Sequence, residues 1–64
     1  MFIIVRINNE IQIREPSRDN LIKDKYGNYW SQNRDVIYSC HSVLEECSDL
    51  QEALDKALFF KALR

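Results

Sequence analysis

Residues 36–62, VIYSCHSVLEECSDLQEALDKALFFKA, carry an apolar residue at almost every third or fourth position. The main row is Val36, Cys40, Val43, Cys47, Leu50, Leu54 and Ala57, with Ile37, Leu44, Ala53 and Leu58 beside it. This spacing is typical of an amphipathic helix, and the positions between are rich in Asp, Glu and Ser. We therefore expect this half of the chain to be helical and to cover a sheet formed by the residues before it.

The first part of this row, about residues 34–47, is predicted to be one helix. Ser31, Gln32 and Asn33 supply possible N-caps directly before it. The alternative is a strand over residues 36–41, because Val, Ile and Tyr favour extended structure. That strand would alternate poorly, since Ser39 would share a face with Ile37, and the helix is therefore favoured.

The second part, about residues 49–63, is predicted to be another helix. Ser48 and Gln51 have the spacing of a capping box, and Glu52 and Lys56 have the favourable i,i+4 order. Because the apolar row keeps its phase across Ser48, the two helices could also form one bent rod. We expect a sharp bend near residues 47–49.

The N-terminal residues predict a hairpin of strands 2–7 and 11–15, joined at Asn8-Asn9-Glu10. A two-residue loop would mix apolar and polar residues on each face. A three-residue loop would pair Ile7 with Ile11 and so give one apolar face. Since a slip of one residue exchanges the faces, we predict the three-residue loop.

A second hairpin is predicted over residues 21–31. Asp24 and Gly27 suit a turn, with Asp at its first position and Gly where a positive φ is needed. The loop 25–27 then places Ile22 opposite Trp30, and Lys23 opposite Tyr29. One face of the hairpin is apolar, and the other carries a cation beside an aromatic ring.

Together these elements predict an α+β fold. A small antiparallel sheet of two hairpins, with three or four strands, would be covered by one bent or two consecutive C-terminal helices. We expect the 64 residues to form a single domain, 1–64, with the sheet in 1–32 and the helical part in 34–63. Its 45% hydrophobic and 30% charged residues are globular values. Such a short chain buries only about 60% of its unfolded surface, so a partner or a second copy would help to stabilise it.

Charge and motifs argue against several functional classes. The net charge is −1, which gives no global signal for binding a polyanion. The apolar start, residues 1–5, is too short for a signal peptide, and no run is long enough to span a membrane, so we expect a cytoplasmic protein.

No catalytic, metal or cofactor site is expected. On one helix Cys40 and Cys47 would lie about 10 Å apart, too far for a disulfide. Cys40, His41 and Cys47 match no zinc-binding spacing, and a chain with one glycine cannot form a phosphate-binding loop. We expect this chain not to be an enzyme.

Two groups of residues are candidates for binding a partner. The first group combines cations with aromatic rings and consists of Lys25, Tyr26, Tyr29, Trp30 and Arg34, beside Lys23. Tyr, Trp and Arg dominate the energetics of protein interfaces, and such a mixture also suits stacking with single-stranded nucleic acid. The alternative is that Trp30 and one of the tyrosines are core residues.

The second group is Phe59 and Leu63, predicted to lie on the helix side opposite Leu50, Leu54 and Ala57. A helix that is apolar on two sides either uses one side to bind a partner or has both sides buried by other parts of its own chain. The surface would then serve homodimerisation or another protein. The alternative is a chain end folded back over the sheet.

These features favour a non-catalytic protein-binding module that occupies a surface of a larger protein or complex. In size and composition the chain resembles the small inhibitors of phages and mobile elements, such as anti-CRISPR or anti-restriction proteins. That resemblance implies a viral accessory protein that inhibits or modulates a host complex. The alternatives are a nucleic-acid-binding accessory protein that uses the basic, aromatic hairpin, and a structural homodimer.

Overall fold

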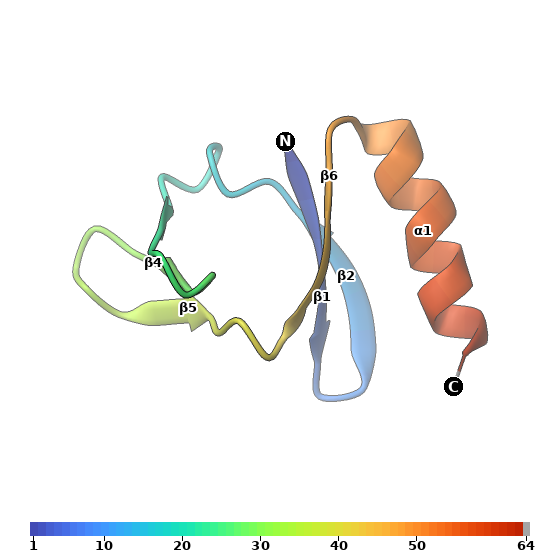
Figure 1. Ribbon diagram of the computed structural model, residues 1–64, viewed down its shortest axis with the longest axis horizontal. Coiled ribbons are helices and arrows are strands. Elements are labelled where there is room, and N and C mark those ends of the chain that lie inside the picture. Colours follow the sequence, from blue (N-terminus) through green and yellow to red (C-terminus); the bar gives the residue numbers. More distant parts are fainter. Residues whose placement is uncertain (64) are drawn as a thin grey trace.

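The computed structural model describes residues 1–63, which form three layers along the longest axis of the molecule (Figure 1). The elements are β1 (Phe2–Ile7), β2 (Glu10–Arg14), β3 (Ile22–Lys23), β4 (Tyr29–Trp30), β5 (Val36–Tyr38), β6 (Val43–Cys47) and α1 (Leu50–Ala62). The α+β class is confirmed, with two small antiparallel sheets and one helix. No helix within residues 1–63 is both long enough and apolar enough to cross a membrane.

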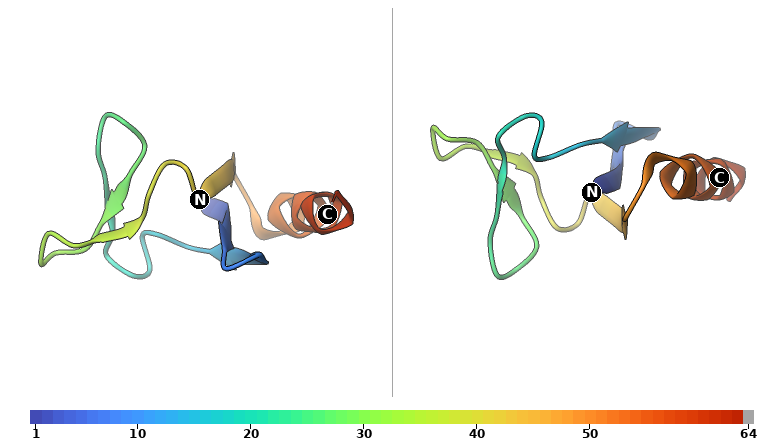
Figure 2. Two further views of the ribbon diagram at one scale, coloured as in Figure 1. Left: turned by 90° about the horizontal axis from the view of Figure 1, so that it is seen from below. Right: turned by 90° about the horizontal axis from the view of Figure 1, so that it is seen from above.

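The larger sheet has the strand order β2-β1-β6 and the smaller sheet has the order β3-β4-β5. Seen end-on, α1 covers one face of the larger sheet, and the smaller sheet packs on its other face (Figure 2). Strand β1 therefore lies in the middle of the molecule, with a neighbour on each edge and a layer on each face. This position explains its apolar run, because a strand covered on both faces needs no polar side.

Two separate cores lie on the two faces of β1. Ile3 and Val5 pack with Tyr29 and Tyr38 of the smaller sheet. Ile4 points to the other face, where its core also contains Cys47, Ala53 and Ala57. Successive side chains of a strand point to opposite faces, so this one short run supplies both cores.

The predicted three-residue loop between β1 and β2 is wrong. Ile7 pairs with Glu10, which leaves a two-residue turn of Asn8 and Asn9. Both asparagines have positive φ, 52° and 67°, as the mirror-image turns of tight hairpins require. The argument from one apolar face failed because β1 is buried on both faces. In this hairpin only β2 alternates between apolar and polar residues, and its Ile11 and Ile13 face the core beneath α1.

The second hairpin follows its prediction. Ile22 pairs with Trp30, and Lys23 pairs with Tyr29. Gly27 has a φ of 92°, and its N–H donates to the carbonyl oxygen of Asp24 at 3.2 Å. The turn chemistry of Asp and Gly was therefore sufficient to predict this register.

The predicted helix over residues 34–47 is wrong, because this segment forms β5 and β6. Ser31, one of the expected N-caps, instead closes a tight turn, where its Oγ accepts hydrogen bonds from the N–H groups of Asn33 and Asp35. The register of β6 against β1 shifts between Ile4 and Val5, and Leu44 is the extra residue. Val43 then packs against one core and Leu44 against the other. This bulge breaks the two-residue alternation and produces a spacing that resembles a helix.

The last helix is confirmed, but it is single and unbent, and a turn from strand to helix replaces the expected bend. Asp49, rather than Ser48, is the N-cap: its Oδ1 accepts from the Glu52 N–H at 2.8 Å. The Glu52 carboxylate accepts from the N–H and Oγ of Ser48 at 2.9 and 3.0 Å. The capping interaction is therefore present one residue later than the sequence pattern suggested.

Candidate binding surfaces

The smaller sheet turns an apolar row away from the core. Ile22 pairs with Trp30 across β3 and β4, and Trp30 pairs with Val36 across β4 and β5. Residues paired in this way share a face, which lies opposite the buried Tyr29 and Tyr38. We call Ile22, Trp30 and Val36 the outer row; Ile22 is 56% exposed, and Val36 is also exposed.

An irregularity in the strand pairing adds to this surface. The register between β4 and β5 shifts at the step from Tyr29 to Trp30, so Ile37 is the extra residue of β5. Ile37 is exposed beside Val36. The edge strand of the smaller sheet thus presents two consecutive exposed β-branched residues.

Asp24 fixes the edge of the Trp30 ring. The Trp30 Nε1–H donates to Asp24 Oδ2 at 2.8 Å. The same carboxylate accepts from the N–H groups of Tyr26 and Asn28 at 2.9 and 3.0 Å, and from Asn28 Nδ2 at 3.1 Å. These donors, with Trp30 contributing most, lower the pKa of Asp24 to about 2. The carboxylate therefore joins the turn and the indole ring into one rigid unit.

This pKa predicts a pH-dependent contribution of Asp24 to stability. The ordinary value is 3.8 and the folded value is about 2, so the contribution is complete above about pH 4 and is lost as the pH falls towards 2. We expect Asp24→Asn to be less stable than the wild type at pH 6. The difference in their free energies of unfolding should become progressively smaller as the pH falls from 4 to 2. Denaturant unfolding followed by Trp30 fluorescence measures this difference. Asp19→Asn, which removes one negative charge from an exposed position, is the control. If Asp24→Asn remained less stable than the wild type by the same amount down to pH 2, the prediction would be contradicted.

The predicted hairpin cluster is divided by the fold. Lys25 and Tyr26 lie at the exposed tip of the turn, where the Lys25 Nζ is 5.2 Å from the centre of the Tyr26 ring. Arg34 lies in the exposed turn before β5, with a φ of 67°. Trp30 is half-buried in the outer row. Tyr29, however, is 1% exposed, so it is a core residue and cannot anchor a partner on this surface.

Lys23 and Tyr29 both serve to join the two sheets. Glu46 of β6 accepts hydrogen bonds from the Lys23 ammonium group and, at 3.4 Å, from the Tyr29 hydroxyl. The hydrogen bond to Glu46 raises the pKa of Lys23. The predicted cation beside an aromatic ring therefore exists, but it lies at the junction of the sheets rather than on an open face.

The second apolar surface lies on α1. The helix packs its smallest residues, Ala53 and Ala57, against the larger sheet and exposes Leu50, Leu54 and Leu58. We call these three residues the leucine row. Its members lie four residues apart, so they share one side of the helix. The expected packing of Leu50 and Leu54 against the sheet is therefore wrong, because the side of the helix that meets the sheet carries Ala53, Ala57 and the partly buried Phe60.

Phe59 and Leu63, the other predicted binding pair, are both exposed near the end of α1. The Phe59 ring makes an edge-to-face contact with Phe60, with ring centres 5.8 Å apart. Leu63 lines a shallow depression with Arg6, Asn9 and Ile11, near the β1–β2 turn. Both residues add apolar area to a helix that already exposes the leucine row.

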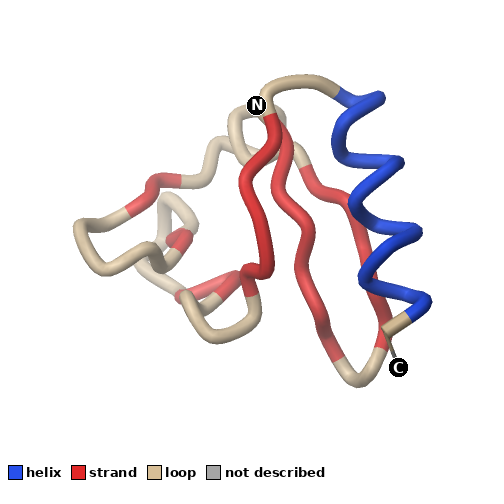
Figure 3. The backbone as a smooth tube through the Cα atoms, turned by 45° about the vertical axis from the view of Figure 1, so that its right-hand side comes forward, coloured by secondary structure: helices blue, strands red, loops and turns tan. Residues whose placement is uncertain are grey.

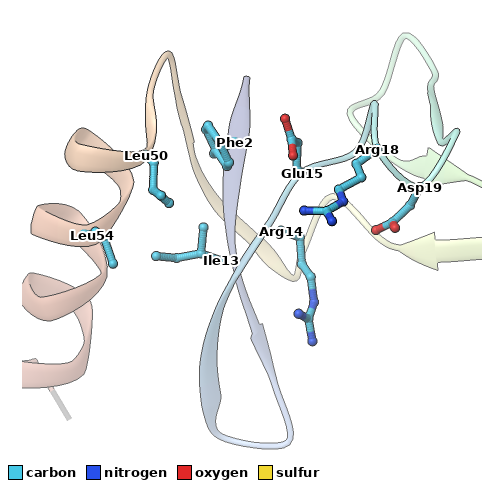
Figure 4. A pocket seen from close by; sticks show the side chains of 8 residues that line it. All are labelled: Phe2, Ile13, Arg14, Glu15, Arg18, Asp19, Leu50 and Leu54. Atoms are coloured by element: carbon cyan, nitrogen blue, oxygen red, sulfur yellow. The ribbon is translucent and has the colours of Figure 1, made fainter.

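An open cleft of about 500 Å³ runs between α1 and the end of β2. Its apolar wall is formed by Phe2, Ile13, Leu50 and Leu54, and its charged wall by Arg14, Glu15, Arg18 and Asp19. In Figure 4 Ile13 points from β2 towards the two leucines, whereas Arg14 leaves the strand on the other side. The leucine row therefore borders the β2 side of the helix.

The thiols and the histidine are dispersed. Cys47 is buried beneath α1, and this burial raises the pKa of its thiol. Cys40 is half-buried, and the neighbouring His41 is exposed. Across the part of the chain that the structure describes, no three His, Cys, Asp or Glu side chains gather closely enough to hold a metal ion.

The sequence interpretation missed Ile22, Val36, Ile37 and the leucine row as surface residues. The pairing of Ile22 with Trp30 was the available signal, but pairing alone does not show which face of a hairpin points outward.

Comparison of the chain with known protein families, curated proteins and solved structures finds no match. The argument for each surface therefore rests on its own geometry.

Proposed function

We propose that this chain is a non-catalytic protein-binding module, which binds a larger protein or complex through the outer row. The observation that carries the proposal is an exposed apolar row, Ile22, Trp30 and Val36, centred on a tryptophan that Asp24 holds in place. A small domain gains no stability from facing these residues to water. Their position is explained if a partner covers them.

The side chains around the row have the composition of an interface. Tryptophan, tyrosine and arginine are the commonest anchors of protein–protein contacts, and Tyr26 and Arg34 lie in the two exposed turns beside Trp30. Because the indole is already fixed by its hydrogen bond, its ordering costs little on binding. Rigid anchors of this kind favour high affinity on a small surface.

The charges near the row indicate the chemistry of the partner. Lys25 and Arg34 make no ion pair with any residue in the described range 1–63. Lys23, in contrast, is paired with Glu46 and is not available. The partner surface is therefore expected to have an apolar depression with acidic residues at its rim.

The resemblance in size and composition to phage and mobile-element inhibitors extends the proposal to a host complex as the target, which the bound module would block. Binding of nucleic acid is less well supported. It would need several exposed rings and cations, whereas Tyr29 is in the core and Lys23 is ion-paired.

The test is a pull-down from native lysate, before and after nuclease digestion, with wild type and Trp30→Ala as matched baits. We expect a protein that survives the nuclease and binds Trp30→Ala at least about thirtyfold more weakly, equivalent to roughly 2 kcal/mol. Far-UV circular dichroism checks that the variant remains folded. Phe59→Ala, an exposed aromatic position on the opposite layer of the molecule, is the control that should keep the partner.

Two results would contradict the proposal. One is a partner that binds wild type and Trp30→Ala equally. The other is the loss of all bound protein on nuclease digestion, which would favour nucleic acid as the ligand. If Trp30→Ala fails to fold, Val36→Asp and Ile22→Asp provide the same comparison, because both positions are exposed.

A further inference from the structure

Strand β2 is an open edge of the larger sheet, since only β1 lies beside it. Arg6, which pairs with Ile11, directs its N–H away from β2, to the carbonyl oxygen of Ser42 at 2.9 Å. Arg6 and Ile11 are therefore not a hydrogen-bonded pair. Because hydrogen-bonded and non-bonded pairs alternate along antiparallel strands, the peptide groups of Ile11 and Ile13 face the open edge.

The sequence of β2, Glu10-Ile11-Gln12-Ile13-Arg14, is complementary to itself in the antiparallel direction. Centred on Gln12, it places Glu10 of one copy opposite Arg14 of the other. Ile11 then lies opposite Ile13, and Gln12 opposite Gln12. The residues whose peptide groups face the edge thus become the hydrogen-bonded pairs. At each end of the paired strands, the negative Glu10 of one copy faces the positive Arg14 of the other.

We propose that two copies of this chain dimerise through β2, joining their larger sheets into one continuous antiparallel sheet of six strands. A two-fold axis at Gln12 relates the copies, so the interface is isologous. The contact is built from main-chain hydrogen bonds of Ile11 and Ile13 and from two symmetric pairs of Glu10 with Arg14.

The leucine row gives this dimer a second set of contacts. Helix α1 lies alongside the hairpin of β1 and β2 (Figure 3), and Leu50 and Leu54 line the cleft beside Ile13. A two-fold axis perpendicular to the sheet keeps both helices on the same face. The leucine rows of the two copies then face one another above the joined isoleucines. This arrangement covers the large apolar side chains that a single copy exposes.

The opposite edge of the sheet is unsuited to the same pairing. Strand β6 carries Glu45 and Glu46 in sequence, and self-pairing there would bring glutamates together. Glu45 is also paired with Lys56 of α1 at 3.5 Å. Charge complementarity therefore selects β2.

A stable dimer would need only a modest part of the surface of each copy. Specific interfaces bury at least about 1,200 Å² in total, or about 600 Å² from each partner, which is roughly an eighth of the 4694 Å² exposed by each copy. The smaller sheet, which carries the outer row, lies on the side of the larger sheet away from α1 (Figure 2), so the dimer leaves the outer row open. The dimer is thus independent of the proposed function. It would display two outer rows, so a partner with repeated sites would bind by avidity.

The first test uses Glu10→Arg and Arg14→Glu, two exposed positions where a charge change should not disturb folding. Sedimentation equilibrium should show a dimer for the wild type and dissociation constants at least about tenfold higher for each variant, because like charges then face each other twice. An equimolar mixture of the two variants should form the heterodimer in native mass spectrometry, because every facing pair is again opposite in sign. A wild type that is monomeric up to about 1 mM overturns the proposal, as do variants that dimerise like the wild type.

The second test locates the two-fold axis. Facing residues of a non-hydrogen-bonded pair have Cα atoms about 4.5 Å apart, within the range of a disulfide. Gln12→Cys should therefore give a covalent dimer under mild oxidation. Ser17→Cys, exposed in the loop after β2, should remain largely monomeric. Equal cross-linking of the two variants, or none at Gln12→Cys, would overturn the proposed register.

Discussion

Tyr29→Ala should unfold the protein, whereas Tyr26→Ala should leave its stability nearly unchanged. Tyr29 is 1% exposed and packs with Ile3, Val5 and Tyr38 between the two sheets. Removing a buried aromatic ring costs about 3–5 kcal/mol, and a domain of this size has a net stability on the order of 3–5 kcal/mol. Tyr26 is 69% exposed, and such surface changes cost less than about 0.5 kcal/mol.

Urea denaturation followed by far-UV circular dichroism measures both changes. Tyr29→Phe keeps the ring and loses only the 3.4 Å hydrogen bond to Glu46, so it should cost no more than about 1 kcal/mol. This variant separates the packing of the ring from the hydroxyl contact. If Tyr29→Ala were as stable as Tyr26→Ala, Tyr29 would not lie between the sheets.

Ala53→Asp should also prevent folding, whereas Leu58→Asp should be tolerated by the folded monomer. Ala53 is 0% exposed and belongs to the core of Ile4, Cys47 and Ala57. An unpaired carboxylate there would lose its hydration, at a cost of several kcal/mol. Leu58 is 66% exposed, so an aspartate at that position stays hydrated.

Thermal unfolding of the two variants tests the orientation of α1. The pair is informative because hydrophobicity alone predicts the reverse result, with leucine essential and alanine dispensable. A folded Ala53→Asp together with an unfolded Leu58→Asp would show that the leucine row, and not the alanines, faces the sheet.

The parts of the fold that the sequence predicted are those set by local chemistry. Asp24 and Gly27 specified the second turn and thereby the pairing of Ile22 with Trp30. The capping-box spacing of Ser48 and Gln51 indicated where the last helix begins, although the N-cap is Asp49, one residue later. Each of these signals acts within a few residues of the chain.

The parts that failed depend on contacts between distant residues. A bulge at Leu44 made β6 resemble a helix, and only its pairing with β1 reveals the strand. The register of the first hairpin was predicted from the assumption that all apolar residues facing one another in the hairpin gather on one face. The smaller sheet covers the other face of β1, so apolar residues are buried on both faces and the assumption does not hold. The residues of the candidate site could not be assigned for the same reason. Tyr29 and Trp30 are adjacent and point to opposite faces of the hairpin, and which of them is exposed depends on which face packs against β1.

The most direct test of this account is a nuclear Overhauser measurement of the contacts of β1 in solution. The account predicts that the methyl groups of Ile3 and Val5 contact the rings of Tyr29 and Tyr38, and that Ile4 contacts the methyl groups of Ala53 and Ala57. That result would place a layer on each face of β1 and leave the outer row and the leucine row exposed. Contacts of Ile4 with Leu54 and Leu58 in place of the alanines, or sequential helical contacts through residues 36–47, would contradict it.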